Sequence, residues 1–287
     1  MSLLPTTTLD YPKKITRAEP SEVVKETKRH IVFQTTQPQR VTEAEYWDKY
    51  YDNTDVIYEW NHGILEEKPV SDYENVLMYR WFLKTLEHYL TNHPIAKITM
   101  LELGFRLNLP NQSGIRRPDL GVVLNNNPVP LQPHDRTYQG ICDMCIEAVS
   151  DSKPEEIKRD TDTKFGEYQA AGIKEYYILY SKGEPMEFYR LNRQSVYVPI
   201  KRVEGDLIQS QVLPGFQFRV SDLYSQPAEK EMSFDSVYEQ FVLPYYQEEK
   251  RKVEEEKRKA QEEKRARLAA ETQIKRLEAE LARLQKK

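Results

Sequence analysis

The pattern of hydrophobic and polar positions in the first third of the chain predicts a short helix, a hairpin and a longer helix. Residues 41–53 repeat apolar positions as an amphipathic helix does, and Thr42 with Glu45 fits a capping box at its start. Two short apolar runs flank Asn61-His62-Gly63, which is typical of a β-hairpin. Over 72–90, apolar residues recur at three- and four-residue steps, which predicts a helix with one broad apolar face.

The middle of the chain is dominated by strand patterns. Four apolar runs bounded by turn residues predict strands over 98–109, 115–124, 141–149 and 175–180. Between the last two, a helical pattern over 154–171 begins with a proline and ends before Gly172. A strand–helix–strand unit of this kind implies a right-handed parallel crossover. Three further runs predict a β meander over 186–191, 195–202 and 211–218. The fold class is therefore α/β, with a mixed sheet flanked by helices.

The two ends of the chain differ from this middle region. Residues 1–40 are rich in Thr, Pro, Lys and Glu without a sustained period, which predicts a flexible N-terminal segment before a globular domain over 41–225. Residues 233–287 are predicted to end the chain as a charged helix, since neither Gly nor Pro occurs from 248 onward and acidic residues precede basic ones by four positions.

An apolar stripe near the C-terminus predicts that this helix has a partner. A seven-residue register aligns Ile274, Leu277, Leu281 and Leu284, whereas each earlier heptad carries a charge at one of its two seam positions. We therefore expect a coiled coil confined to the last turns. Its partner is either a second copy of the chain, giving a homodimer, or a helix of a different protein.

The distribution of charge bears on the choice of partner. The chain has 42 basic and 46 acidic residues, of which residues 247–287 hold 14 and 10, so the rest carries 28 and 36. An acidic globular part is not typical of a tight, sequence-independent nucleic-acid binder. No apolar stretch approaches the roughly 18 residues that span a bilayer, and no secretory signal pattern opens the chain. We expect no membrane partner and a cytoplasmic location.

Three charged residues occupy positions where apolar side chains are expected. Asp119 lies in the apolar run 115–124 and Glu147 in 141–149, and a carboxylate buried there costs several kcal/mol unless it is paired, hydrogen-bonded or bound to metal. Lys164 falls in the middle of the apolar face of the helix 154–171, one turn after Asp160. Each has a structural alternative: a strand-entry turn, a loop anchor, and a lysine paired with Asp160 at the rim of the core.

Taken together, the order acid, acid, inward lysine favours a metal site. Mg²⁺ is often held by one or two carboxylates and keeps several waters, so Asp119 and Glu147 suffice as ligands of Mg²⁺ or Mn²⁺. Two carboxylates that face one site repel each other. We therefore expect removal of either one to stabilise the metal-free protein.

Several segments in a fixed order resemble the Uma2 family of restriction-endonuclease-like proteins. They are Tyr58-Glu59-Trp60 with Gly63, Arg117-Pro118-Asp119-Leu120, residues 146–150, Asp160 to Lys164, and residues 168–177. The resemblance covers residues 45–220. It implies the PD-(D/E)xK nuclease fold and Mg²⁺-dependent hydrolysis of phosphodiester bonds.

The resemblance also implies roles for individual residues. Asp119 and Glu147 would bind the metal, and Lys164 would be the catalytic lysine, because the general pattern's lysine position holds Val149 here. Accessory roles are implied for Glu59, which would complete or orient the site, and for Asp160. A further accessory residue is Arg117, which, like Arg116, would contact a neighbouring phosphate or form a surface salt bridge.

The sequence leaves three functions open. The first is a Mg²⁺-dependent endonuclease acting on DNA. The second is an inactive nuclease-fold protein that binds partners through its coiled coil. The third is a metal-dependent hydrolase of small phosphorylated compounds, which suits the acidic globular part better.

Overall fold

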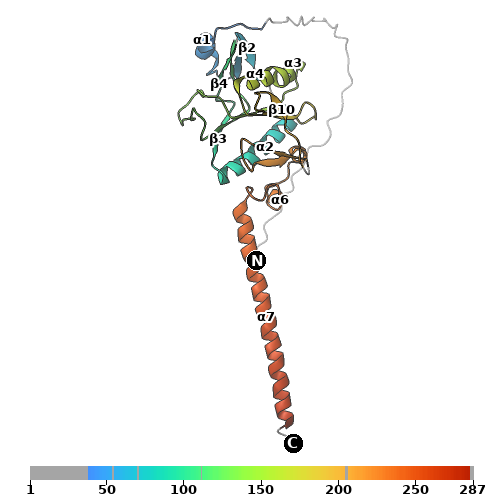
Figure 1. The fold of residues 1–287 in the computed structure, drawn as a ribbon. Helices are drawn as coiled ribbons and strands as arrows, with labels where there is room; N and C mark the ends of the chain where they lie inside the picture. The colour runs from blue at the N-terminus through green and yellow to red at the C-terminus, as the bar shows by residue number, and fades with distance from the viewer. Residues whose placement is uncertain (1–37, 54, 70, 111, 204–205, 285–287) are drawn as a thin grey trace, which may run out of the picture. The chain divides into compact units, whose positions relative to one another are not determined.

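The computed structural model describes residues 38–53, 55–69, 71–110, 112–203 and 206–284. The chain divides into two units, 1–37 and 38–287. Nearly all of the predicted flexible segment 1–40 therefore lies outside the described residues. Within the second unit, most helices and strands occur in the order that the sequence predicts, and a long helix ends the described chain (Figure 1).

The first predicted helix is present in a shorter form. It consists of α1 (Glu43–Glu45) continued by a π-helical turn, η1 (Tyr46–Tyr50). The Thr42 hydroxyl accepts a hydrogen bond from the Glu45 amide at 3.2 Å, and the Glu45 carboxylate accepts one from the Thr42 amide at 2.9 Å. The predicted capping box is therefore confirmed.

The predicted hairpin belongs to a four-stranded antiparallel sheet. Its strands are β1 (Tyr58–Asn61) and β2 (Ile64–Glu67), and His62 and Gly63 both adopt positive φ at the turn. The sheet has the order β2-β1-β5-β4, completed by β4 (Phe105–Leu109) and β5 (Gln112–Arg116). This small sheet brings Glu59 of β1 and Arg116 of β5 toward the centre of the molecule.

A six-stranded mixed sheet with the order β10-β9-β8-β7-β6-β3 forms the centre of the fold. Its strands are β3 (Ala96–Met100), β6 (Leu120–Leu124), β7 (Met144–Ala148), β8 (Glu175–Leu179), β9 (Glu187–Leu191) and β10 (Tyr197–Pro199). Strands β7 and β8 pair in parallel and the other pairs are antiparallel. The predicted mixed sheet and its parallel crossover are confirmed.

Two of the predicted strands are each divided between the two sheets. The run 98–109 becomes β3 and β4, and the run 115–124 becomes β5 and β6. Pro118 lies in the second break, where its missing amide hydrogen prevents continuous pairing. Because the chain changes sheets there, Asp119 lies at the junction, next to the start of β6.

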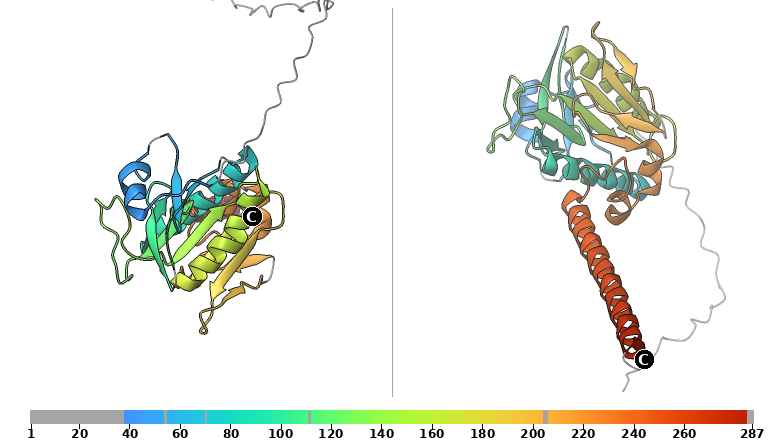
Figure 2. Two further views of the ribbon diagram at one scale, coloured as in Figure 1. Left: turned by 90° about the horizontal axis from the view of Figure 1, so that it is seen from above. Right: turned by 60° about the horizontal axis from the view of Figure 1, so that its bottom comes forward.

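Helices cover both faces of the six-stranded sheet (Figure 2). Helix α2 (Tyr73–Asn92), capped by Asp72, packs Phe82 edge-on against Tyr177 of β8. The neighbouring residue of that strand, Tyr176, packs against Tyr168 on the opposite face. Because successive side chains of a strand point to opposite faces, these contacts place the two helical layers on either side of the sheet.

The predicted helix over 154–171 is confirmed, with a local change of geometry in its middle. It comprises α3 (Pro154–Lys158), a π-helical segment η2 (Arg159–Thr163) and α4 (Lys164–Ala171). Gly172 ends it at φ 82°, as the sequence predicts. Asp160 lies inside the widened segment and Lys164 follows it directly. Turns of this kind often occur at functional sites.

The predicted β meander is only partly present. Strands β9 and β10 extend the central sheet, whereas β11 (Leu207–Gln209) and β12 (Gln217–Arg219) form a separate pair. Two short helices follow, α5 (Val220–Ser225) and α6 (Glu229–Met232). Tyr238, Phe241 and Val242 are buried in the main hydrophobic core, so the chain contributes to the core beyond the predicted end of the domain at 225.

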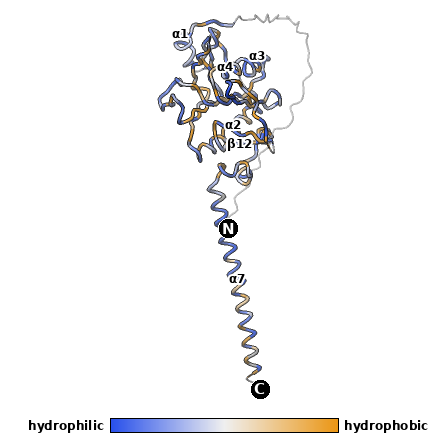
Figure 3. Tube along the Cα trace, in the orientation of Figure 1, coloured by the Kyte–Doolittle hydropathy of each residue, from blue (hydrophilic) through white to orange (hydrophobic). Residues whose placement is uncertain are grey.

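The C-terminal helix α7 (Pro244–Leu284) begins later than the predicted 233. Most of its residues are hydrophilic, and the apolar ones concentrate in its second half (Figure 3). Ile274, Leu277, Leu281 and Leu284 are 55–68% exposed. The helix is confirmed, and its pairing as a coiled coil stays a prediction. In the part of the chain that the structure describes, no helix is long and apolar enough to cross a membrane.

Candidate active site

Four carboxylates and two lysines from five separate segments meet beside the parallel strand pair. The carboxylates are Glu59 (β1), Asp119 (before β6), Glu147 (β7) and Asp160 (η2). Lys164 begins α4, and Lys68 follows β2 directly. The structure therefore brings together Asp119, Glu147, Lys164, Glu59 and Asp160, which the sequence singles out, and adds one lysine that it does not.

Glu147 lies at the centre of this charged cluster and is fully buried. Its Oε1 accepts a hydrogen bond from the Tyr168 hydroxyl at 2.8 Å. Its Oε2 is shared by two ammonium groups, Lys164 Nζ at 2.9 Å and Lys68 Nζ at 3.1 Å. Because β7 points Glu147 toward the helix 154–171, the carboxylate meets both Tyr168 and Lys164 from that helix.

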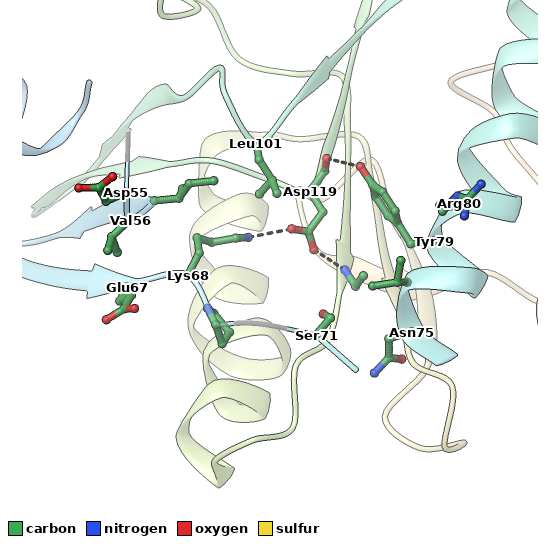
Figure 4. A pocket seen from close by; sticks show the side chains of 14 residues that line it. Asp55, Val56, Glu67, Lys68, Ser71, Asn75, Tyr79, Arg80, Leu101 and Asp119 are labelled. Atoms are coloured by element: carbon green, nitrogen blue, oxygen red, sulfur yellow. Dashed lines mark hydrogen bonds and ion pairs between the residues drawn. The ribbon is translucent and has the colours of Figure 1, made fainter. Parts of the chain in front are cut away.

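Asp119 is held at the junction between the two sheets by main-chain contacts. Its Oδ2 accepts a hydrogen bond from the Ala148 amide at 2.6 Å, and its carbonyl accepts one from the Tyr79 hydroxyl at 3.1 Å. The remaining carboxylate oxygen, Oδ1, lies 3.1 Å from Lys68 Nζ (Figure 4). One oxygen of Asp119 is thus fixed by β7, and the other contacts a side chain.

Lys68 joins the two carboxylates for which the sequence predicts metal binding. Its Nζ lies 3.1 Å from both Asp119 Oδ1 and Glu147 Oε2. This residue does not stand out in the sequence, because Glu66-Glu67-Lys68 resembles a solvated run at the end of a hairpin. The available signal was its position just before Pro69, where the chain leaves the strand and turns toward α2.

Lys164 lies deeper in the protein than Lys68 and is 1% exposed. Besides Glu147, its Nζ lies 2.9 Å from Asp160 Oδ1 and 3.6 Å from Glu59 Oε2. The predicted inward orientation of Lys164 is therefore confirmed. The pairing of Lys164 with Asp160, which is the structural alternative expected from the sequence, is also confirmed.

Two buried arginines organise the surrounding carboxylates. Arg116, which is fully buried, donates to both oxygens of Glu167 at 2.7 and 2.9 Å and to Glu59 Oε2 at 3.2 Å. It also donates to Glu66 Oε2 at 2.5 Å. Glu59 is further fixed because its Oε1 accepts from the Arg117 amide at 2.8 Å. Glu59 thereby connects the arginine network to Lys164.

Arg117 has a structural role that the sequence does not predict. Its guanidinium donates to the carbonyl oxygens of Leu101, Tyr51 and Glu102 at 2.7, 2.8 and 3.0 Å. It also lies over the Tyr51 ring, 4.8 Å from its centroid. These bonds occupy the guanidinium within the protein. Because Arg117 is buried and forms no ion pair among the described side chains, the alternative of a surface salt bridge is wrong for it. The phosphate contact stays a prediction for Arg117 and for the buried Arg116.

Burial and the lysine charges act in opposite directions on the carboxylates. Burial raises the pKa of Asp160 to about 6, although Lys164 opposes this shift. Burial also raises the pKa of Asp119, against the opposing charge of Lys68. For Glu147, burial favours the neutral form, but the charges of Lys164 and Lys68 outweigh it and hold the pKa below its usual value. The central glutamate is therefore ionised at neutral pH.

This distribution of charge corrects one expectation from the sequence. Asp119 and Glu147 do not face each other across an uncompensated site, because Lys68 lies between their oxygens and Lys164 contacts Glu147. Removing Glu147 leaves two buried ammonium groups with fewer partners. Loss of one partner of a buried ion pair is strongly destabilising. We therefore expect its removal to destabilise the metal-free protein.

A pocket of about 410 Å³ opens above the cluster. Asp119 and Lys68 reach its floor, and its walls include Ile57, Tyr79 and Leu101 (Figure 4). Glu147 and Lys164 lie behind these two residues, with side chains only 1% exposed. A ligand in the pocket therefore meets Asp119 and Lys68 before it meets the deeper residues.

The donor set at this point fits a small divalent cation. Asp119 Oδ1 and Glu147 Oε2 contact the same ammonium nitrogen, so the two oxygens already converge on one cation position. Two carboxylates with waters completing the shell are a ligand set that Mg²⁺ uses. The described residues contain no group of three or more His, Cys, Asp and Glu side chains arranged for a metal ion. A metal at this position would have Asp119 and Glu147 as its side-chain ligands.

A family model described as "Putative restriction endonuclease", Uma2, matches residues 43–221, which is more than half of the chain. The chain belongs to the Uma2 family. The resemblance identified from the sequence motifs is thus confirmed, and so is the restriction-endonuclease-like α/β fold class. Among curated proteins, none matches the chain.

One solved structure similar to this Uma2 chain is that of a putative nuclease belonging to DUF820 from Anabaena variabilis ATCC 29413. It is 14% identical, with a TM-score of 0.44 over 59% of this chain and 90% of that one. The Uma2 match includes Lys68 and all of the predicted site residues. Helix α7 follows the matched region.

Proposed function

We propose that this Uma2 protein is a metal-dependent endonuclease that hydrolyses phosphodiester bonds of DNA. Asp119 and Glu147 would hold Mg²⁺ or Mn²⁺ in this mechanism. The observation that supports the proposal is the convergence of Asp119 Oδ1 and Glu147 Oε2, each 3.1 Å from one ammonium nitrogen that reaches the floor of a pocket. The family description is consistent with this chemistry.

The chain's own residues hold the two carboxylates in place. The Ala148 amide fixes Asp119 Oδ2, and the Tyr168 hydroxyl fixes Glu147 Oε1, so the cation would contact Asp119 Oδ1 and Glu147 Oε2, the second of which Lys164 also contacts. A bound metal ion would supply charge stabilisation at the phosphate and an activated water. Lys164 lies behind Glu147, so we assign it the orientation of that carboxylate in place of the direct contact with water or phosphate implied by the resemblance.

A cleavage assay tests this function directly. Full-length protein is incubated with supercoiled plasmid and with single-stranded DNA in Mg²⁺, in Mn²⁺ and in chelator. We expect metal-dependent cleavage by the wild type and none by Asp119→Asn. Glu229→Gln is the matched control, since Glu229 is a carboxylate that pairs with Lys84 and His88 outside the site. Cleavage by Asp119→Asn at the wild-type rate would refute the proposal. Hydrolysis of nucleotides with plasmid left intact would favour a hydrolase of small phosphorylated compounds.

The exposed stripe on α7 supports a second candidate, a nuclease-fold protein that works by binding a partner. Leu277 is 57% exposed and Leu281 is 60% exposed on a helix whose other positions are mostly charged. An isolated helix gains little stability from such a stripe until another helix covers it. We propose that the stripe pairs with the same segment of a second chain.

Sedimentation separates this self-pairing from binding to a different protein. We expect the full-length protein to dimerise at micromolar concentrations, because only two or three heptads are apolar. A chain ending at Tyr246 should remain a monomer. Monomers in both cases would refute self-pairing. A dimer that cleaves no DNA under any metal condition would favour the binding function over the nuclease.

A further inference from the structure

Lys68 occupies the position that the proposed function assigns to a metal ion. It is the first residue after β2, and its side chain is 10% exposed at the pocket. Its ammonium nitrogen is equally close, at 3.1 Å, to Asp119 Oδ1 and Glu147 Oε2. Those are the two oxygens that converge on one point. An ammonium and a divalent ion cannot both occupy the one position between these two oxygens, because they would overlap and repel each other.

The two lysines of the cluster differ in what surrounds them. Lys164 is enclosed by Glu147, Asp160 and Glu59 and lies behind the pocket floor. Lys68 contacts one oxygen of each acid, Asp119 Oδ1 and Glu147 Oε2, and the other oxygen of each acid is bound by the Ala148 amide or the Tyr168 hydroxyl. Lys68 can therefore leave without disturbing the bonds that hold the acids in place.

The pocket has space for the Lys68 side chain once it leaves the two carboxylates. Its neighbours Glu67 and Pro69 both line the same pocket, so the backbone of this segment borders the cavity. A lysine displaced from the two carboxylates would turn its ammonium into this space. A phosphate group bound next to the metal position would lie within reach of that ammonium.

We propose that Lys68 is a built-in cation that a divalent metal displaces, and that its released ammonium then binds the phosphate of the substrate. The proposal rests on the metal-dependent function proposed above. In the metal-free protein, Lys68 neutralises the repulsion between Asp119 and Glu147. When a metal is present, the same lysine becomes a phosphate-binding residue at the mouth of the site.

Metal binding without nucleic acid tests the first half of this exchange. Mn²⁺ binding to the full-length protein is followed by electron paramagnetic resonance for the wild type, Lys68→Gln and Lys68→Arg. Because Lys68→Gln removes the competing charge and keeps a hydrogen-bond donor, we expect it to bind Mn²⁺ about tenfold more tightly or better. Lys68→Arg keeps the charge and should not gain affinity. Lys182→Gln, which alters an exposed lysine paired with Asp72 and Asp151, is the matched control and should equal the wild type.

The outcomes distinguish this exchange from the nuclease function itself. Tighter binding by Lys68→Gln supports the exchange, even if the wild type binds Mn²⁺ too weakly to measure. If the wild type binds and Lys68→Gln binds equally or more weakly, the exchange is wrong while a metal site remains. If neither binds, both the exchange and the metal-dependent function are wrong. Thermal melts of each variant identify any loss of folding, and a Mn²⁺-dependent rise in Tm gives a second measure of binding.

Oligonucleotide binding tests the second half. In Ca²⁺, which takes oxygen ligands as Mg²⁺ does, we expect Lys68→Gln to bind a short single-stranded oligonucleotide about tenfold more weakly than the wild type, despite its higher metal affinity. A purely structural lysine would not change these two affinities in opposite directions. Oligonucleotide affinity that stays the same or rises with metal affinity would refute the phosphate contact.

Discussion

Glu147 on β7 and Glu175 on β8 are both fully buried carboxylates on neighbouring parallel strands, but their partners differ. Glu175 accepts hydrogen bonds from the Ser210 hydroxyl at 2.7 Å, the Gln211 amide at 2.7 Å and the Tyr177 hydroxyl at 3.0 Å. Its one cationic donor is Arg190, at 3.1 Å. Glu147 accepts one bond from a hydroxyl and otherwise contacts two lysines.

The difference separates a structural carboxylate from a candidate ligand. The neutral donors around Glu175 come from the chain itself and tie the segment 210–211 to the sheet. They cannot leave without local unfolding. The ammonium of Lys68 next to Glu147 is a cation at the edge of a pocket. In the exchange proposed above, a divalent metal would replace it. Burial in an apolar strand is common to both residues, so the nature of the donors distinguishes them.

The largest expected effect is on cleavage. Glu147→Gln should lower metal-dependent cleavage on the order of 10⁴-fold, because it removes one member of a unit that acts together. Lys164→Ala and Asp119→Ala should have effects of similar size, and the triple variant should be little worse than any one of them. Glu175→Gln should cleave at the wild-type rate per folded molecule. Single-turnover assays compare Glu147→Gln with Glu175→Gln, and circular dichroism measures the folded fraction of each. Equal losses of cleavage in Glu147→Gln and Glu175→Gln would contradict the distinction between a candidate ligand and a structural carboxylate.

The next effect is on stability. Glu175→Ala should lower the free energy of unfolding by about 3 kcal/mol, since it leaves Arg190, Ser210 and the Gln211 amide without their acceptor. Urea titrations with and without Mn²⁺ should show the same loss. Glu147→Gln should also be destabilising without metal, and it should in addition lose the stabilisation that bound Mn²⁺ gives the wild type. If Glu147→Gln were more stable than the wild type without metal, the result would support the repulsion between Asp119 and Glu147 that the sequence predicts.

The stability of the folded protein should depend on pH through Asp160, which belongs to the charged cluster around Glu147. Burial raises the pKa of Asp160 to about 6, so the folded protein holds a proton that the unfolded chain releases near pH 4. Stability from this group is therefore present below about pH 4 and is lost as the pH rises toward 6. Asp160→Asn should remove this loss, worth up to about 3 kcal/mol. Urea titrations of both proteins at pH 4.5 and 6.5 measure it. Identical pH profiles would contradict the assignment.

The smallest effects should come from two tyrosine hydroxyls. Tyr168→Phe removes the bond to Glu147, and Tyr177→Phe removes the bond to Glu175. Each should lower the free energy of unfolding by about 1 kcal/mol. Only Tyr168→Phe should also weaken Mn²⁺ binding, by about tenfold, because it frees a carboxylate oxygen that would otherwise be fixed. Weakened Mn²⁺ binding in Tyr177→Phe would show that the effect is not local to Glu147.

Local patterns were sufficient for much of the fold. The capping box at Thr42, the hairpin turn at Gly63 and the helix stop at Gly172 depend on residues close in sequence, and all three are present. The division of residues 98–124 between two sheets was missed. It depends on which strands pair across the molecule, and strand pattern alone does not contain that information.

The site was predictable only in part for a related reason. Asp119, Glu147 and Lys164 stand out because each interrupts an apolar pattern. Lys68 follows two glutamates and interrupts nothing, and only the fold brings it to Glu147, 79 positions away. The rule that identifies Glu147 applies equally to Glu175, whose structural partners come from Arg190 and residues 210–211.

The spread of the cluster along the chain has a consequence for its synthesis. Glu59 and Lys68 leave the ribosome early, Asp119 and Glu147 later, and Lys164 only with the helix that connects the parallel strands. Long-range pairings of this kind form late in folding, because the chain between them must first be ordered. A nascent or truncated chain that ends before residue 164 therefore lacks the group that orients Glu147. In the proposed function, the site would therefore become active only once the whole domain has been synthesised.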